Sequence, residues 1–337
     1  MEAAMSLYQL RDDLPRAVYD DFVFPLGIVP APGLVPLQGW TMQWTTGEGE
    51  FEDCCTFHVV QSLDRLAPLV EACFRLLPER GLHGILELGS RDAYRAVDVY
   101  LGDQPMDRDQ FIRIWRLFEP IFLEDAGLAV GVNAEDPFVE IFLDPDKGLL
   151  VHVDPSLQEE VRALLSEHGV DEAPVVGYEL DDEELERIGI RPVLVQADGL
   201  IGDMDQLLQE LRYEWHLELD EDPDTNVDGR GRRIGRTLWH AVVIMEKDTG
   251  EAVHEAHATV WGSAASRREM EELIDRRLQR EVPWTMRELY VLDRAAFDDR
   301  PQELDALPPV PEASGIHLVR IEPLGDPWSP GGGGLNG

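Results

Sequence analysis

The spacing of apolar residues divides most of the chain into strands and helices. Trp40, Met42 and Trp44 alternate with polar residues, which is the period-two pattern of a half-buried strand. From Leu66 to Leu77 apolar residues recur every three or four positions, which predicts a helix that closes at Gly81. The first half is further predicted to contain strands at 51–60, 83–88, 94–101 and 128–132, and a hairpin of strands 138–143 and 149–153 that turns through 144–148.

Two further helices are predicted in the first half. Residues 106–125 place an aromatic stripe on one helical face, which we interpret as core, and Pro120 is expected to kink this helix. Asp154 followed by Pro155 is typical of an N-cap and first helical position, and this helix ends at Gly169. The stripe consists of Phe111, Trp115, Phe118 and Phe122.

The second half repeats the same kinds of element. A helix is capped at Asp203, and the alternation over 213–220 predicts a half-buried strand. Ser266 and Glu269 form a capping box at the start of another helix. Further strands are predicted at 193–196, 236–246, 252–261 and 287–292, with an edge strand at 316–321.

This pattern predicts an α+β protein of two domains, each an antiparallel sheet covered by helices. The order helix, strand, hairpin, helix occurs at 106–168 and again at 203–281, so the two domains could be similar in topology. Duplication and the general likeness of α+β layers both explain this order. The predicted organisation is a proline-rich lead-in at 1–36, an α+β domain at 37–170, an acidic linker at 171–189, an α+β domain at 190–300 and a Pro/Gly-rich tail at 301–337.

Charge narrows the range of partners. The 337 residues include 67 acidic and 29 basic side chains, a net charge of -38, and only Lys147 and Lys247 are lysines. Such a chain repels phosphates, so we expect no nucleic-acid or anionic membrane partner. Three interpretations of the charge remain open: solubility or adaptation to high salt, binding of a basic protein, and mimicry of nucleic acid.

The cysteines and the terminus indicate a compartment. Cys54, Cys55 and Cys73 are an odd number with two adjacent, which is no disulfide framework. The N-terminal residues are acidic where a signal peptide would be basic, and no apolar run reaches the roughly 18 residues of a membrane span. We therefore expect a cytoplasmic protein. Cys54, Cys55 and His58 lie close in sequence, but nothing more indicates a catalytic thiol.

Histidines on successive predicted strands form the first candidate metal site. His216, His240 and His257, with Glu255, would share one face of an antiparallel sheet if the register is right. Several imidazoles with one carboxylate suit a divalent transition metal. The alternative interpretation is the polar face of a half-buried sheet.

A second candidate site lies between two predicted strands. Asp224, Asn226 and Asp228, followed by Gly229, match the first half of a calcium-binding loop. Gly235 occupies the position where a bidentate glutamate is required, and four arginines crowd the segment. The alternative is an ordinary turn at 227–229.

The leading functional hypothesis is a non-catalytic acidic protein-binding module that acts as an adaptor, regulator or inhibitor, without a cofactor and with a basic partner. It follows mainly from the charge and from the lack of a glycine-rich nucleotide loop or nucleophile motif. The alternative is a metal-dependent hydrolase that uses the His/Glu set and a divalent metal. Arginines 267, 268, 276, 277 and 280 form the one sizeable basic cluster in the sequence, which could pair with the acidic linker or with another chain.

Overall fold

The computed structural model describes residues 7–47, 53–92, 94–180, 187–197, 199–250, 252–281, 283–308 and 312–328. Its contacts divide the chain into two compact units. The first unit comprises Met1–Gly89 with Val99–Asp220, and the second comprises Ser90–Asp98 with Glu221–Gly337. The fold is α+β with antiparallel sheets, which confirms the predicted class.

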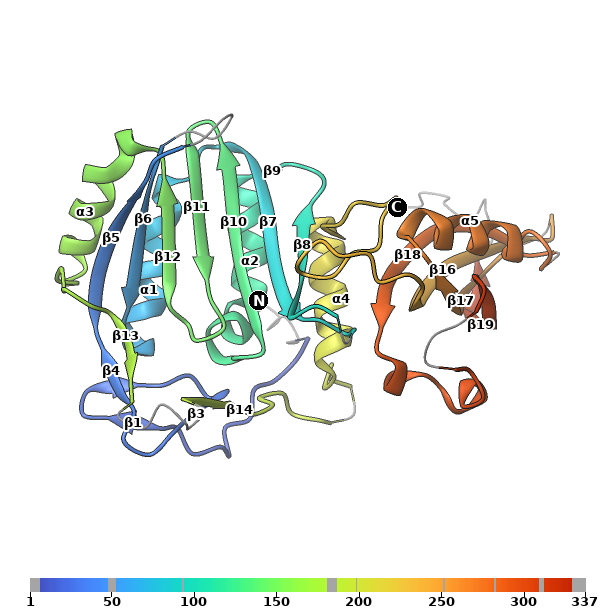
Figure 1. The fold of residues 1–337 in the computed structure, drawn as a ribbon, viewed down its shortest axis with the longest axis horizontal. Coiled ribbons are helices and arrows are strands. Elements are labelled where there is room, and N and C mark those ends of the chain that lie inside the picture. Colours follow the sequence, from blue (N-terminus) through green and yellow to red (C-terminus); the bar gives the residue numbers. More distant parts are fainter. Residues whose placement is uncertain are drawn as a thin grey trace, which may run out of the picture. The chain divides into compact units, whose positions relative to one another are not determined.

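The first unit is built on one large antiparallel sheet (Figure 1). Its strand order is β15-β8-β7-β10-β11-β12-β6-β5, and the short β9 pairs with β7. The hairpin β11–β12 has the predicted bounds. The strands are β5 (Gly39–Thr45), β6 (Cys54–Val60), β7 (Arg80–Gly89), β8 (Val97–Gly102), β9 (Met106–Asp107), β10 (Leu128–Glu135), β11 (Phe138–Leu143), β12 (Leu149–Val153) and β15 (Leu217–Leu219).

Helices supply the apolar side chains that pack on one face of this sheet. The aromatic stripe of α2 is fully buried there, as expected, because its residues recur on one helical face. Asp107 caps α2 by accepting a hydrogen bond from the Gln110 N–H, and Asp203 caps α4 in the same way through Asp205. The helices are α1 (Leu63–Cys73), α2 (Arg108–Glu124), α3 (Gln158–Glu167) and α4 (Met204–Trp215).

The two faces of the sheet differ because side chains alternate along each strand. On β6, Cys55, Phe57 and Val59 are fully buried in the core with the helices. Thr56 and His58 lie between them in sequence and therefore point to the other face. That other face also carries His152 of β12, which is likewise half-buried.

The lead-in and the acidic segment pack on the first unit together. Phe22 and Phe24 of the lead-in contact Tyr178 of the acidic segment, and all three belong to one apolar cluster. Val176, Tyr178, Leu180 and Ile188 are partly buried against the same cluster, so the described parts of 171–189 pack within the first unit and do not form a free linker. The short strands are β1 (Val18–Tyr19) paired with β2 (Phe22–Val23), β3 (Ile28–Pro30) with β14 (Ile188–Ile190), and β4 (Val35–Leu37) with β13 (Gly177–Glu179).

The predicted strand at 213–220 is wrong. Residues up to Trp215 belong to α4, whose apolar residues Leu207, Leu208, Leu211 and Trp215 follow helical spacing and are buried. His216 ends the helix with φ of 50°, and only the short β15 follows. Because α4 and β15 join the first sheet, the boundary between the compact units lies at 220/221 instead of 171–189.

The second unit is a four-stranded antiparallel sheet in the order β18-β16-β17-β19, with one helix, α5 (Arg267–Leu278). Met270, Ile274 and Leu278 of α5 pack on alternate residues of β16 and β17. The two units differ in strand number and order, so the expected likeness in topology is not seen. The strands are β16 (Thr237–Asp248), β17 (Val253–Ala264), β18 (Thr285–Ala295) and β19 (Gly315–Trp328).

A buried ion network ties Ser90–Asp98 into the second unit. The side chain of Arg294 is 3% exposed, and its guanidinium lies 3.1 Å from Asp92 and 3.0 Å from Asp98 and pairs with Glu221. Burial lowers the pKa of Arg294. Arg95 pairs with Asp92 and donates to the side-chain oxygen of Asn226. Two arginines thus hold three buried carboxylates, which no sequence pattern predicts.

The remaining predictions differ mainly at their bounds. The strand predicted at 193–196 is only one bridge, between Leu10 and Leu194, and the tail forms the long β19. The sequence also predicts one short helix within the acidic segment, at 183–188. Its first four positions lie outside the described residues, and Ile188 begins β14. Residues 329–337 also lie outside them. No helix within the described ranges has the length and apolarity to cross a membrane.

Candidate functional site

The predicted His/Glu set does not come together. Glu255 and His257 share one face of β17, and His240 of β16 lies opposite Trp261 while His257 lies opposite Ile244. Four residues of strand therefore separate the two histidines, about 13 Å at some 3.4 Å per residue. His216 belongs to the first unit, at the end of α4.

Each member of that set has another neighbour. The His240 ring packs against Trp261 at 4.7 Å between centroids. Glu255 pairs with Arg287, and His257 lies 3.0 Å from Glu322. These contacts favour the polar face of a half-buried sheet, the alternative interpretation of the pattern.

The oxygens of the calcium-like segment are occupied by protein donors. Asp224 pairs with Arg268 of α5. Asp228 accepts from the N–H groups of Arg230 and Arg232, both at 2.9 Å, and its hydrogen bonds to Arg232 lower its pKa to about 2. Asn226 donates to the carbonyl of Gly235 and to Thr237. Among the residues that the structure describes, no group of three His, Cys, Asp or Glu could hold a metal ion.

The arginines of α5 do not form an open basic surface. Arg267, Arg276 and Arg277 each pair with a glutamate four residues away, and Arg268 pairs with Asp224. The thiol of Cys55 is fully buried, which raises its pKa, and it faces away from His58. Neither feature supports catalysis.

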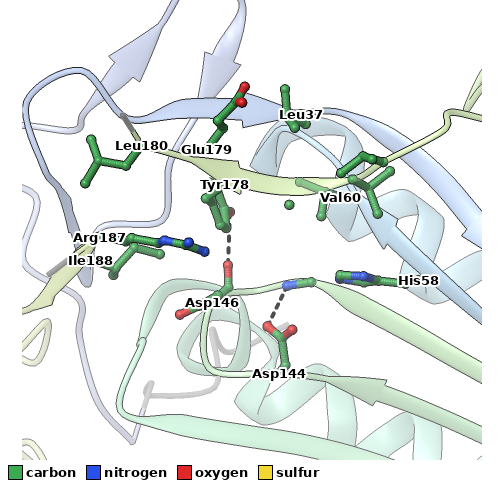
Figure 2. A pocket seen from close by; sticks show the side chains of 14 residues that line it. Leu37, His58, Val60, Asp144, Asp146, Tyr178, Glu179, Leu180, Arg187 and Ile188 are labelled. Atoms are coloured by element: carbon green, nitrogen blue, oxygen red, sulfur yellow. Dashed lines mark hydrogen bonds between the residues drawn. The ribbon is translucent and has the colours of Figure 1, made fainter. Parts of the chain in front are cut away.

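A pocket of about 550 Å³ in the first unit does bring chemically distinct groups together. It lies between the β4–β13 ribbon and the turn that joins β11 to β12 (Figure 2). Its volume falls within the range of small-ligand sites, roughly 300–1,000 Å³. Its apolar walls include Leu37, Val60, Val176, Leu180 and Ile188, and its polar residues are His58, Asp144, Asp146, Tyr178, Glu179 and Arg187.

The β11–β12 turn supplies the carboxylates. The Gly148 N–H donates to Asp144 Oδ1 at 2.7 Å, and the Asp144 N–H donates to the Gly148 carbonyl at 3.0 Å. Burial raises the pKa of Asp144 to about 6. The turn thus holds in the pocket a carboxyl group that titrates near neutral pH.

Lys147 stabilises the turn by a hydrogen bond to the neighbouring strand β10. Its side chain is buried with φ of 63°, and Nζ donates to the Leu128 carbonyl at 2.8 Å. Burial lowers the pKa of Lys147 to about 8, although Asp125 and Asp144 oppose the shift. This lysine, one of two in the chain, therefore stabilises the turn through a hydrogen bond to β10, and its side chain is not among the residues that line the pocket.

The other side of the pocket is held by Tyr178 of β13. Its hydroxyl donates to the Asp146 carbonyl at 3.1 Å, and its ring stacks on Phe24 with centroids 5.9 Å apart. Burial raises the pKa of Tyr178, so the phenol stays neutral. The ring position is fixed by contacts from the lead-in.

His58 lies on the sheet face opposite the helices, beside a row of polar side chains that crosses neighbouring strands. Burial lowers the pKa of His58, which keeps the imidazole neutral at pH 7. Two residues earlier on β6, Thr56 Oγ1 lies 2.9 Å from Nδ1 of His152, whose Nε2 is 3.7 Å from Glu140. The strands β6, β11 and β12 each pair on both sides, so their backbone N–H groups are used within the sheet. The residues of this row are register partners from one strand to the next, in the order His83, Asn133, Glu140, His152, Thr56 and Gln43.

The sequence predicts the 144–148 turn but not its place in a pocket. The available signal was one of two lysines placed beside two aspartates in a hairpin turn. In the sequence His58 stands out only because it is near Cys54 and Cys55, and Tyr178 falls in the predicted linker, so neither is predicted to line a pocket. Comparison with protein-family models, curated proteins and solved structures finds no match to this chain.

The raised pKa of Asp144 predicts a pH-dependent cost in stability. A carboxyl whose folded pKa of about 6 exceeds its unfolded value near 3.8 loses stability as pH rises between those values. Asp144→Asn is therefore expected to be more stable than the native protein at about pH 8, by about 1–2 kcal/mol, and to show no such gain below pH 4. Urea unfolding at both pH values measures this difference.

Asp154→Asn is the matched control. Hydrogen bonds from Ser156 lower the pKa of Asp154, so this substitution is expected to give no gain at high pH. A gain for Asp144→Asn that is equal at both pH values would contradict the assignment of the cost to the buried charge.

Proposed function

We propose that the protein is a non-catalytic acidic binding module of the cytoplasm, an adaptor, regulator or inhibitor, that recognises a basic protein partner. The observation that supports it is the pocket of the first unit, whose lining includes three carboxylates, Asp144, Asp146 and Glu179, and one arginine, Arg187. Val175 borders this pocket with 61% of its surface exposed, so apolar contact is available beside the charge.

The overall charge supports the same function. The net charge of -38 attracts basic proteins over several ångströms and repels nucleic acids. The arginines of α5 are largely paired within the protein, which leaves the excess of carboxylates uncompensated. Long-range attraction would bring a basic partner to the surface, and the pocket would provide the specific contact.

Affinity capture with a pocket variant tests the proposal. Asp144→Asn with Asp146→Asn is expected to reduce capture of protein partners from a native lysate by about tenfold or more, since charge-assisted hydrogen bonds would be lost. The control, Glu159→Gln with Glu160→Gln in the first turn of α3, changes the net charge equally away from the pocket. Captured proteins should elute as salt rises.

Equal capture by the native protein and both variants would sink the proposal, because the interaction would then not depend on the pocket. Capture that both variants lose equally would show attraction by net charge alone. Thermal unfolding of each variant confirms that the fold is retained.

A further inference from the structure

The part of the pocket above Gly148 is bordered by two hydrogen-bonding atoms. A Cβ atom placed on Gly148 would lie 2.6 Å from Asp144 Oδ2 and 3.0 Å from His58 Nε2. Both the carboxylate oxygen and the imidazole nitrogen therefore come close to the Gly148 backbone, and they lie near each other at one wall of the pocket (Figure 2). Glycine is required here by close approach, since its φ is not among the positive ones.

Both atoms can accept hydrogen bonds. No hydrogen bond to His58 is found among the described residues, and its neutral ring accepts at Nε2 when the proton is on Nδ1. Asp144 Oδ1 accepts from the Gly148 N–H within the turn, and Oδ2 is the oxygen that lies near His58 Nε2. A ligand group that fits must donate to both atoms and carry positive charge.

An ammonium group fits better than a guanidinium. Arginine gains most from a carboxylate that turns both oxygens toward its planar fork, whereas Asp144 turns Oδ1 toward the Gly148 N–H of its own turn. An ammonium is a compact charge with three donors and can reach the carboxylate and the imidazole together. Leu37, Val60 and the Tyr178 ring line the approach and suit the methylene stem of a lysine side chain.

We propose that the pocket binds the primary ammonium group of a lysine side chain presented by the partner, held between Asp144 Oδ2 and His58 Nε2. This inference rests on the proposed function and names the group that the pocket selects.

Binding of an ammonium is linked to pH. Burial raises the pKa of Asp144 to about 6, so its carboxylate becomes protonated below that pH and loses its attraction. Asp146 and Lys147 on the same turn, His58 on β6 and Tyr178 on β13 face it. Protonation of His58 would also repel the ligand, so affinity is expected to fall by roughly tenfold per pH unit below about pH 6.

Titration with two small probes tests the inference. Nα-acetyl-lysine N-methylamide is added to the full chain and compared with its arginine analogue, with calorimetry and the His58 ring signals in NMR as readouts. The lysine probe is expected to bind about tenfold tighter than the arginine probe, and acetylation of its ammonium to abolish binding. Equal binding of the two probes, tighter arginine binding or no saturable lysine binding would each overturn it.

Two variants give the test a matched pair. Gly148→Ala places a methyl group against Asp144 Oδ2 and His58 Nε2 without changing charge, displaces these acceptors and is expected to weaken the lysine probe by about tenfold or more. Gly89→Ala, at the end of β7 with no atom within 4 Å of its added Cβ, should bind as the native protein does. His58→Phe keeps the ring, removes the acceptor and is expected to weaken the probe as well.

The outcomes separate the inference from the proposed function. Selective lysine binding without any captured protein would support the inference and count against a protein partner. Capture that depends on the pocket while the probes bind equally would overturn the inference and leave the proposed function standing.

Discussion

Arg294→Met is expected to lower the free energy of unfolding of the second unit by about 3–5 kcal/mol, because it removes one partner from a buried ion network. Asp92, Asp98 and Glu221 would keep their charges in a site where the native guanidinium is 3% exposed. Asp92 would keep its pair with Arg95, whereas Asp98 and Glu221 would lose the arginine that they contact. Urea unfolding and amide exchange of β16 and β18 measure the loss.

Arg276→Met is the matched control. Its guanidinium is 61% exposed and lies 3.9 Å from Glu272 of the same helix. Exposed pairs of this kind contribute about 0–1 kcal/mol, so the control should unfold almost as the native protein does. A cost for Arg294→Met of less than about 1 kcal/mol would show that water reaches the network and that the buried arrangement is not maintained.

A double-mutant cycle assigns the cost to the ion pairs. Asp98→Asn should destabilise the native protein but cost less in the Arg294→Met background, since the variant already lacks the partner of that carboxylate. Additive losses would indicate that the contact of the Arg294 guanidinium carbon with the Trp239 ring, 5.8 Å from its centroid, dominates instead.

Trp215→Ala is expected to destabilise the first unit by about 3–5 kcal/mol, the usual range for removing a buried aromatic ring. The Trp215 side chain is fully buried, and its ring lies 5.4 Å from Phe111 and 5.7 Å from Phe122. Its removal leaves a cavity between α2, α4 and β7. Thermal and urea unfolding provide the measurement.

Trp44→Ala is the control, because Trp44 is 47% exposed on β5. It should cost about 1 kcal/mol or less, as surface substitutions do. A second test uses Gly84, where an added Cβ would lie 2.6 Å from the Trp215 ring. Gly84→Ala should be destabilising in the native protein and much less so beside Trp215→Ala, and equal costs in both backgrounds would refute the close packing.

The pocket and the charge explain different aspects of the proposed function. The charge favours approach of any basic protein and is weakened by salt. In our proposal the pocket discriminates among basic groups, because Asp144 Oδ2 and His58 Nε2 lie near enough to each other to suit one compact ammonium. The cost in stability expected from Asp144 is consistent with a residue kept for binding.

The sequence predicts an element correctly where the spacing of its apolar residues matches the side chains that are buried in the fold. The β11–β12 hairpin and the buried stripe of α2 follow from strand and helix spacing, which the structure confirms at Phe138–Leu143, Leu149–Val153 and Phe111. Asp107 and Asp203 cap helices because short-range hydrogen bonds satisfy the first free N–H groups. The sequence also determined the α+β class and the excess of negative charge.

The tertiary structure decided everything that depends on distant segments. Trp215 fits both an alternating and a helical pattern, and burial against Phe111 selected the helix. The pocket needs Tyr178 stacked on Phe24 above Asp144, and the network needs Arg294 beside Asp92. Spacing along a chain specifies which side chains share a face of a helix or strand. Which faces pack together depends on the burial of apolar surface over the whole molecule, which cannot be worked out from the spacing within one segment.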